Sequence, residues 1–197
     1  MASVYLETSV IGYLASRPGT DIIFAANQLM TLEWWNDQRS RFELFASQAV
    51  VDECSAGDPT AAKERLVFLD GIPVLAINAA TQNLAQELIR RVGLPAKAAV
   101  DALHIAIAAL NRIDYLLTWN CKHIANASKR TLIETICEAA GASGGGPDGA
   151  PARGWRPSRA AMSRPGASST LGRSRTPSTW EPSRCGRGRK CSSTARA

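Results

Sequence analysis

A chain of 197 residues is long enough for one domain with a buried core, or for one domain followed by a tail. Its formal net charge is +6, but residues 142–197 contribute a net +9, so residues 1–141 carry a net −3 and give no sign of a basic nucleic-acid-binding face. No stretch reaches the ~18 to 20 apolar residues of a membrane span, and no export signal is visible. We therefore expect a cytoplasmic protein without membrane association, with its 5 cysteines as reduced thiols.

Residues 142–197 differ in composition from the rest of the chain. They contain 10 Ser, 9 Gly and 6 Pro, and no Ile, Val, Phe or Tyr. Such a segment buries too little apolar surface to offset the roughly 1–2 kcal/mol per residue that backbone ordering costs. We predict a folded domain over 1–141 and a disordered basic tail over 142–197. The abrupt change after Gly141 is typical of a frameshifted reading of GC-rich DNA, and a genuine basic arm that binds RNA is the alternative.

The amino-terminal half of the chain alternates short apolar runs with helical patterns. Ser3–Leu6 is predicted as a first strand, and the polar residues after it place a hydroxyl where it can cap a helix over Val10–Ser16. Thr20–Asp37 is predicted as a long amphipathic helix with these apolar residues at helical spacing: Ile22, Ala26, Leu29, Met30 and Trp34 or Trp35. Phe42–Ala46 alternates like a second strand, and the next helix begins at Gln48.

The second half repeats this alternation. Its predicted elements are a helix over Ala61–Leu69, an extended segment over Gly71–Leu75, a helix over Asn78–Val92, an apolar helix beginning near Pro95, a buried strand over Tyr115–Thr118, and a last helix over Arg130–Ala140 that Gly141 ends. Alternating strands and helices of these lengths predict the α/β class, as a three-layer α/β/α sandwich with a mainly parallel sheet.

Four oxygen-bearing side chains occupy equivalent places in this pattern. Glu7 follows the first strand, Glu53 lies on the helix after the second, Asp101 lies on the apolar central helix, and Asn120 follows the last strand. Because the carboxyl ends of parallel strands face one crevice, these residues can converge. Carboxylates held close together repel, and a divalent cation relieves the repulsion. Oxygen donors favour the hard ions Mg²⁺ or Mn²⁺.

Several short motifs resemble one known family. They are Tyr5-Leu6-Glu7-Thr8-Ser9-Val10, the acid Glu53 after Val50-Val51, Asp101-Ala102-Leu103-His104-Ile105-Ala106, and Leu117-Thr118-Trp119-Asn120 followed by His123-Ile124. Together they resemble the PIN-domain ribonucleases, close to the VapC-type toxins of toxin-antitoxin modules. The resemblance implies metal-dependent cleavage of RNA, with Glu7, Glu53 and Asp101 as acidic metal ligands and Asn120 at the fourth position. In such domains the first acid is usually Asp and the fourth position is often acidic.

Each of these residues also has an ordinary structural interpretation. Asp101 can be neutralised by a nearby basic side chain, Glu53 can belong with Asp52 to a solvated helix face, Glu7 can be a plain strand-end acid, and Asn120 can form a turn. Thr8 can be a helix cap or a site residue, and Thr118 a strand-end residue or a support for the metal ligands. His104 can be a packed core histidine or a base, and Lys97 a solvated lysine or a group that attracts phosphate. His123 is interpreted as a surface turn residue.

Three functions agree with these residues. The first is an Mg²⁺- or Mn²⁺-dependent endoribonuclease that is the toxin of a toxin-antitoxin pair, with an RNA substrate, a cognate antitoxin and, as the resemblance implies, a homodimeric state. The second is a catalytically attenuated module that binds RNA or the antitoxin. A DNA nuclease is the third, because the phosphate chemistry is the same and only contacts to the 2′-hydroxyl discriminate RNA.

Overall fold

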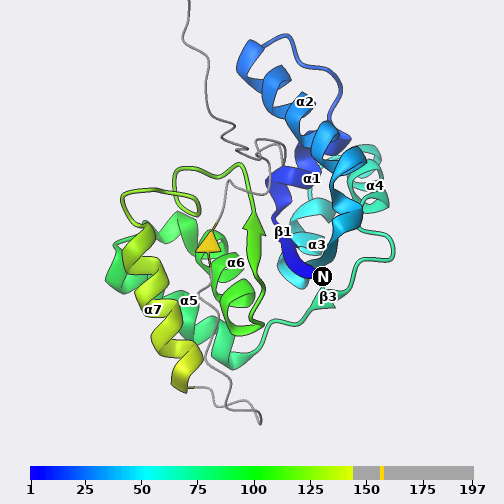
Figure 1. Ribbon diagram of the computed structural model, residues 1–197. Helices are drawn as coiled ribbons and strands as arrows, with labels where there is room; N and C mark the ends of the chain where they lie inside the picture. Colours follow the sequence, from blue (N-terminus) through cyan, green and yellow to red (C-terminus); the bar gives the residue numbers. More distant parts are fainter. Residues whose placement is uncertain (144–155, 158–197) are drawn as a thin grey trace, which may run out of the picture. The chain divides into compact units, whose positions relative to one another are not determined.

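The computed structural model describes residues 1–143 and 156–157 (Figure 1). All of these residues belong to one compact unit, Met1–Ser163. Most of the predicted tail over 142–197 lies outside the described residues, and so do the predictions of its disorder and its origin. The described part consists of the end of the last helix and one two-residue strand. In the described part of the chain, no helix is both long and apolar enough to span a membrane.

A parallel sheet in the order β3-β2-β1-β4-β5 forms the centre of the fold. Its strands are β1 (Ala2–Leu6), β2 (Phe42–Ser47), β3 (Val74–Leu75), β4 (Tyr115–Leu117) and β5 (Arg156–Pro157). The first strand is central, since Val4 is paired with Leu44 on one side and with Tyr115 on the other. The predicted parallel sheet is confirmed.

Seven α-helices surround this sheet in the described residues. They are α1 (Thr8–Ala15), α2 (Ile22–Asp37), α3 (Gln48–Ser55), α4 (Pro59–Val67), α5 (Ala79–Val92), α6 (Ala99–Leu110) and α7 (Arg130–Ser143). Local sequence explains several boundaries. The carboxylate of Asp58 accepts from two backbone N–H groups at the start of α4, and Asn78 forms a capping box with Thr81 at the start of α5. Gly93 ends α5 at φ 68°, a left-handed conformation that favours glycine.

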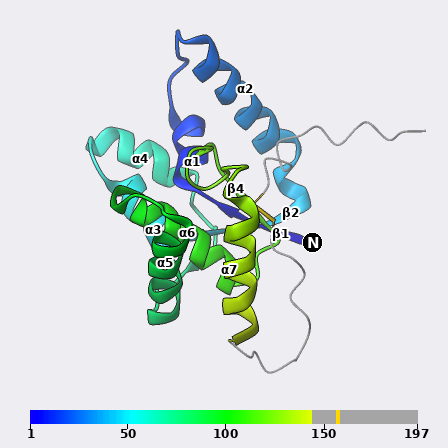
Figure 2. The same ribbon diagram turned by 90° about the vertical axis from the view of Figure 1, so that its left-hand side faces the viewer.

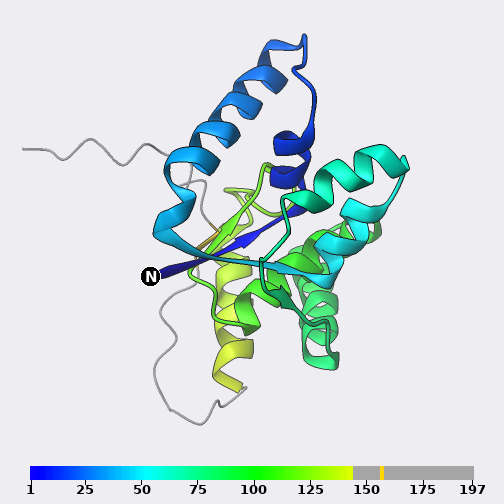
Figure 3. The ribbon, with the colours of Figure 1, turned by 90° about the vertical axis from the view of Figure 1, so that its right-hand side faces the viewer.

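Helices cover both faces of the sheet. On one face the ring of Tyr5 packs against His104 of α6, and on the other Phe42 packs against Trp34 of α2 and against Tyr115 of β4. Successive residues of a strand point to opposite faces, so these contacts define two separate packing layers. Figures 2 and 3 agree, with α1, α2 and α4 on one side of β1 and α5, α6 and α7 on the other. The three-layer α/β/α architecture is confirmed.

Some predicted details of the helices are wrong. The first helix begins at Thr8 rather than Val10, and no side-chain hydroxyl caps it, because the residue at the cap position is Glu7. The apolar spacing along α2 marks its buried face only at Trp34 and Trp35, since Ile22 is 84% exposed and Leu29 is 67% exposed. The buried residues of α2 are Gln28, Thr31, Trp34 and Trp35.

Two polar side chains contribute to the buried face of α2. Gln28 donates to the carbonyl oxygens of Tyr13 and Ser16, and Thr31 accepts from the indole of Trp119. These hydrogen bonds, together with the packing of Trp34 against Phe42, lie on the buried face of the helix. At the other end of the described chain, Gly141 does not end the last helix, which continues to Ser143.

Candidate active site

Strand register brings three polar residues together at the carboxyl edge of the sheet. Leu6 of β1 is paired with Leu117 of β4, and the backbone N–H of Glu7 extends this pairing with a 3.1 Å hydrogen bond to the Leu117 carbonyl oxygen. Glu7 therefore lies beside Thr118. On the other side of β1, continuing the pairing of Tyr5 with Phe45 by two residues places Ser47 beside Glu7. The carboxylate that follows the first strand, Glu7, thus lies between the hydroxyl-bearing residues at the ends of the two neighbouring strands.

The carboxylate of Glu7 is held by two hydroxyl groups. Its Oε2 accepts a hydrogen bond from Thr118 Oγ1 at 2.7 Å and another from Ser9 Oγ. Those hydroxyl groups are themselves oriented by backbone N–H donors, from Asn120 to Thr118 at 2.8 Å and from Trp119 to Ser9 at 2.9 Å. Glu7 is only 6% exposed, so these donors replace the water that a carboxylate loses on burial.

The second carboxylate, Glu53, reaches the same edge from α3. Ser47 caps this helix by accepting from the backbone N–H of Val50, and Glu53 follows one turn later. Its Oε2 accepts from Thr8 Oγ1 at 2.5 Å and lies 2.9 Å from Nε2 of His104. Burial raises the pKa of the Glu53 carboxyl, but the hydrogen bonds with His104 and Thr8 outweigh burial and hold the pKa below its usual value. Glu53 is therefore an anion at neutral pH.

These residues converge into one group of possible metal ligands. One ligand atom each from Glu7, Glu53 and His104 lies within 4.8 Å of the other two. The side chain of Glu53 is 40% exposed, so the group is open to solvent on one side. Two carboxylates at this separation repel unless a cation lies between them, and carboxylate oxygens suit Mg²⁺ or Mn²⁺. The residues present therefore fit a divalent cation.

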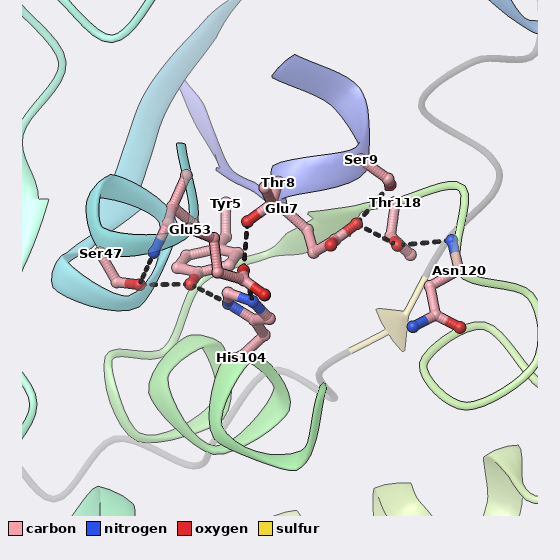
Figure 4. Close-up of polar contacts among 10 residues, drawn as sticks. Tyr5, Glu7, Thr8, Ser9, Ser47, Glu53, His104, Thr118 and Asn120 are labelled. Atoms are coloured by element: carbon pink, nitrogen blue, oxygen red, sulfur yellow. Dashed lines mark hydrogen bonds and ion pairs between the residues drawn. The ribbon is translucent and has the colours of Figure 1, made fainter. Parts of the chain in front are cut away.

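Asp101 and Asn120 lie in a second group that is joined through His123. Asp101, in the first turn of α6, has its Oδ2 at 2.8 Å from Nδ1 of His123, and the backbone N–H of His123 donates to Asn120 Oδ1 at 3.1 Å. Asn120 is linked to the first group through its backbone N–H, which donates to Thr118. Figure 4 shows His104 and Glu53 on one side of Glu7, with Thr118 and Asn120 on the other.

The structure thus brings Glu7 and Glu53 together directly and connects Asp101 and Asn120 to each other through a histidine. His123 lies in a turn, as predicted, but it is not a surface residue, because its side chain is only 13% exposed and paired with Asp101. Asp101 does have a basic partner, but it is this histidine rather than an arginine or lysine. Asn120 does accept a local turn hydrogen bond, as its alternative interpretation predicts.

Of the polar residues that support the two carboxylates, sequence reasoning weighs Thr8 as a site residue and Thr118 as a support for the metal ligands, but it does not identify Ser9. The hydroxyl groups of Ser9 and Thr118 donate to Glu7, and that of Thr8 donates to Glu53. A signal for them exists, because all three residues directly follow a strand end that carries a proposed ligand. The hydrogen bond between His104 and Glu53 has no such signal, since 51 residues separate the two.

Comparison with known families identifies the fold. The model of the PIN domain family matches residues 4–122. The chain belongs to the PIN domain family. The matched segment contains all four proposed ligands, from Glu7 through Asn120, and PIN domains are generally nucleases that act on RNA and usually use a divalent metal. Comparison with curated proteins gives no significant match.

Proposed function

We propose that this PIN domain is an Mg²⁺- or Mn²⁺-dependent endoribonuclease and the toxin of a toxin-antitoxin pair, similar to the VapC-type toxins. One observation carries the proposal: two carboxylates from different elements, Glu7 after β1 and Glu53 on α3, converge within 4.8 Å at the carboxyl edge of a parallel sheet. Neither carboxylate has a lysine or arginine partner among the described residues, so their mutual repulsion favours binding of a cation.

In this proposal Glu7 and Glu53 hold the cation, and Asp101 and Asn120 act from the neighbouring group. When bound, a divalent cation supplies Lewis-acid chemistry, lowering the pKa of a water molecule and neutralising charge on the RNA phosphate. The hydroxyl groups of Thr118 and Ser9 fix the orientation of Glu7 by donating to its Oε2. Asp101 is paired with His123, which also links it to Asn120 in the second group.

The proposed partners follow from the same assignment. They are an RNA substrate, a cognate antitoxin protein and a second copy of the chain, and we place the activity in the cytoplasm, where a toxin of this kind meets cellular RNA. Induced expression in a bacterial host tests the toxin role. We expect growth to stop and to resume when the neighbouring small gene is expressed with it, whereas unimpeded growth without an antitoxin would contradict the role.

The nuclease proposal is tested by cleavage of structured RNA by the full chain with Mg²⁺, with Mn²⁺ and with a chelator. We expect cleavage with either ion, none with the chelator, and a loss of at least a hundredfold in Glu7→Gln and in Glu53→Gln. Asp52→Asn is the matched control, because Asp52 is an exposed acid on the same helix whose carboxylate accepts from Gln48. Equal loss in the control and in Glu53→Gln would contradict a specific metal site, and preference for DNA of the same sequence would favour a DNA nuclease.

A catalytically attenuated binding module is the second candidate. It is favoured by the neutral Asn120 at the fourth position and by the pairing of Asp101 with His123, which leaves two carboxylates facing each other rather than four ligands. The same assay separates the candidates. Retention of RNA on the protein without cleavage at any Mg²⁺ or Mn²⁺ concentration would favour the binding module.

A further inference from the structure

A chain of buried hydrogen bonds connects the core of the domain to the Glu53 carboxylate. Tyr5 and His104 are both fully buried. The hydroxyl of Tyr5 lies 2.6 Å from Ser47 Oγ and 2.7 Å from Nδ1 of His104, and Nε2 of His104 lies 2.9 Å from Glu53 Oε2. Figure 4 shows the sequence of contacts running from Ser47 through Tyr5 and His104 to Glu53.

Glu53 determines the direction of this chain. A carboxylate only accepts hydrogen bonds, so Nε2 of His104 carries the proton that faces Glu53. In the neutral ring Nδ1 is then an acceptor, and it accepts a hydrogen bond from the hydroxyl of Tyr5. The oxygen of Tyr5 in turn accepts from Ser47, whose own oxygen accepts from the backbone N–H of Val50. Every donor in this series of hydrogen bonds therefore has one acceptor.

This series of hydrogen bonds ends at Glu53, the most exposed member of the proposed metal site. The Glu53 side chain is 40% exposed and has three rotatable bonds, whereas the His104 side chain is 1% exposed and is fixed by contacts at both ring nitrogens. A rigid buried donor limits the orientations that a flexible carboxylate can adopt. Thr8 supplies only one further donor to Glu53, at the same Oε2 atom.

We propose that His104 and Tyr5 are positioning residues that hold the Glu53 carboxylate ready for the cation, an inference that rests on the proposed function of Glu53 as a metal ligand. Neither residue needs to touch the cation. Groups that orient a metal ligand in this way typically change metal affinity or activity by 10- to 100-fold when they are removed. The competing role for His104 is that of an imidazole ligand of the cation, because its Nε2 belongs to the same group of possible metal ligands as Glu7 and Glu53.

Calorimetric titration of the full chain with Mn²⁺ and with Mg²⁺ tests the proposal, alongside RNA cleavage. We expect Tyr5→Phe to weaken binding of both ions about tenfold and His104→Leu to weaken it 10- to 100-fold. His104→Gln should recover most of the affinity, because its amide nitrogen can donate to Glu53 from the position of Nε2. Tyr115→Phe is the matched control, since Tyr115 pairs with Val4 and so lies on the opposite face of the sheet from Tyr5.

Three results would overturn the positioning role. One is unchanged affinity for both ions in Tyr5→Phe and His104→Leu, which would leave the proposed nuclease function intact if the wild-type chain binds metal and cleaves RNA. Another is a His104→Gln variant as weak as His104→Leu, with Mn²⁺ binding reduced far more than Mg²⁺ binding, because that pattern identifies an imidazole ligand. Absence of metal binding in the wild-type chain would instead overturn the proposed function, and the positioning role with it.

A spectroscopic measurement on the wild-type chain keeps the test decisive if a variant fails to fold. The chain contains 2 histidines, so the ¹⁵N resonances of His104 can be assigned by comparison with His123→Gln. We expect the neutral tautomer with the proton on Nε2. A proton on Nδ1 would reverse the hydrogen-bond chain, remove the donor that faces Glu53 and overturn the proposal.

Discussion

Thr118 and Glu7 are joined by a 2.7 Å hydrogen bond although 111 residues separate them in sequence. Parallel pairing of β1 with β4 makes the contact possible, because it aligns Leu6 with Leu117 and so places the next residue of each strand side by side. The buried carboxylate just after the central strand β1 therefore depends on a hydroxyl from the residue that follows β4. This dependence can be measured.

Thr118→Val removes the hydroxyl at nearly constant shape. Hydrogen bonds to charged groups contribute about 1.5–3 kcal/mol, and Glu7 would keep only the donor from Ser9. We expect the free energy of unfolding in urea, without added metal, to fall by about that amount. Thr118→Ser retains the hydroxyl and should lose less than half as much. Equal losses in the two variants would show that the methyl group, rather than the hydrogen bond, carries the effect.

Saturating Mg²⁺ or Mn²⁺ should stabilise the native state, because the converging carboxylates exist only in the folded chain. Binding at 100 times Kd corresponds to about 2.7 kcal/mol, which should raise the melting temperature of the full chain measurably. The increase should vanish in Glu7→Gln, whose stability without metal should be close to that of the wild type or higher, since one buried charge is removed. No shift with either ion in the wild type would contradict a metal site at this edge.

Asp101→Asn and Asn120→Asp change the charge of the second group in opposite directions. The first removes an anion but keeps an oxygen that can face His123, so we expect metal-dependent cleavage to be lost while the domain stays folded. The second adds an anion and keeps an oxygen to accept from the backbone N–H of His123, so it should lower the Mn²⁺ concentration needed for half-maximal cleavage.

Asn126→Asp is the matched control for the second variant. Asn126 lies in the same turn region, and its Oδ1 also accepts from a backbone N–H, that of Ser128. We expect no change in the Mn²⁺ requirement from this substitution. If Asp101→Asn still cleaves RNA and Asn120→Asp needs the same Mn²⁺ concentration as the wild type, the metal site would be restricted to the group of Glu7, Glu53 and His104.

The sequence predicts the elements of this domain better than the contacts between them. The alternation of short apolar strands with helices was sufficient for the parallel sheet and for the placement of Glu7 and Glu53 at its carboxyl edge. Orientation of α2 was only partly predictable, because its buried face includes the polar contacts made by Gln28 and Thr31. The pairing of Asp101 with His123 was not predictable either, because it depends on how the turn after β4 folds back over α6.

Two buried cysteines predict a loss of stability in alkaline solution. Burial raises the pKa of Cys54 to about 11 and that of Cys137 to about 12, from an ordinary value of 9.0. Above pH 9 the unfolded chain releases these protons while the folded chain keeps them, so stability that is complete below pH 9 should fall as the pH rises toward 11 to 12. The slope of unfolding free energy against pH should be flatter in a double Cys54→Ala, Cys137→Ala variant. Cys121→Ala, at an exposed thiol, should leave the slope unchanged.

The indole of Trp119 connects α2 to the edge of the sheet that carries the proposed site. Its Nε1 donates to Thr31 at 2.8 Å, its ring packs against Tyr13, and its backbone N–H donates to Ser9, which donates to Glu7. Trp119→Phe removes the indole donor, while the hydroxyl of Thr31 keeps its bond to the carbonyl oxygen of a residue one turn earlier. Thr31→Val has the opposite effect, because it leaves the indole N–H without an acceptor, at a cost of about 1–3 kcal/mol.

A double-mutant cycle with these two substitutions should therefore be non-additive. We expect a coupling of about 0.5–1.5 kcal/mol between Trp119→Phe and Thr31→Val in urea unfolding, the contribution of one neutral hydrogen bond. Hydrogen exchange should become faster in the turns of α2 around Thr31, because the indole of Trp119 connects that part of the helix to the end of β4. Additive losses would show that the ring contact with Tyr13, rather than the hydrogen bond to Thr31, holds α2 in place.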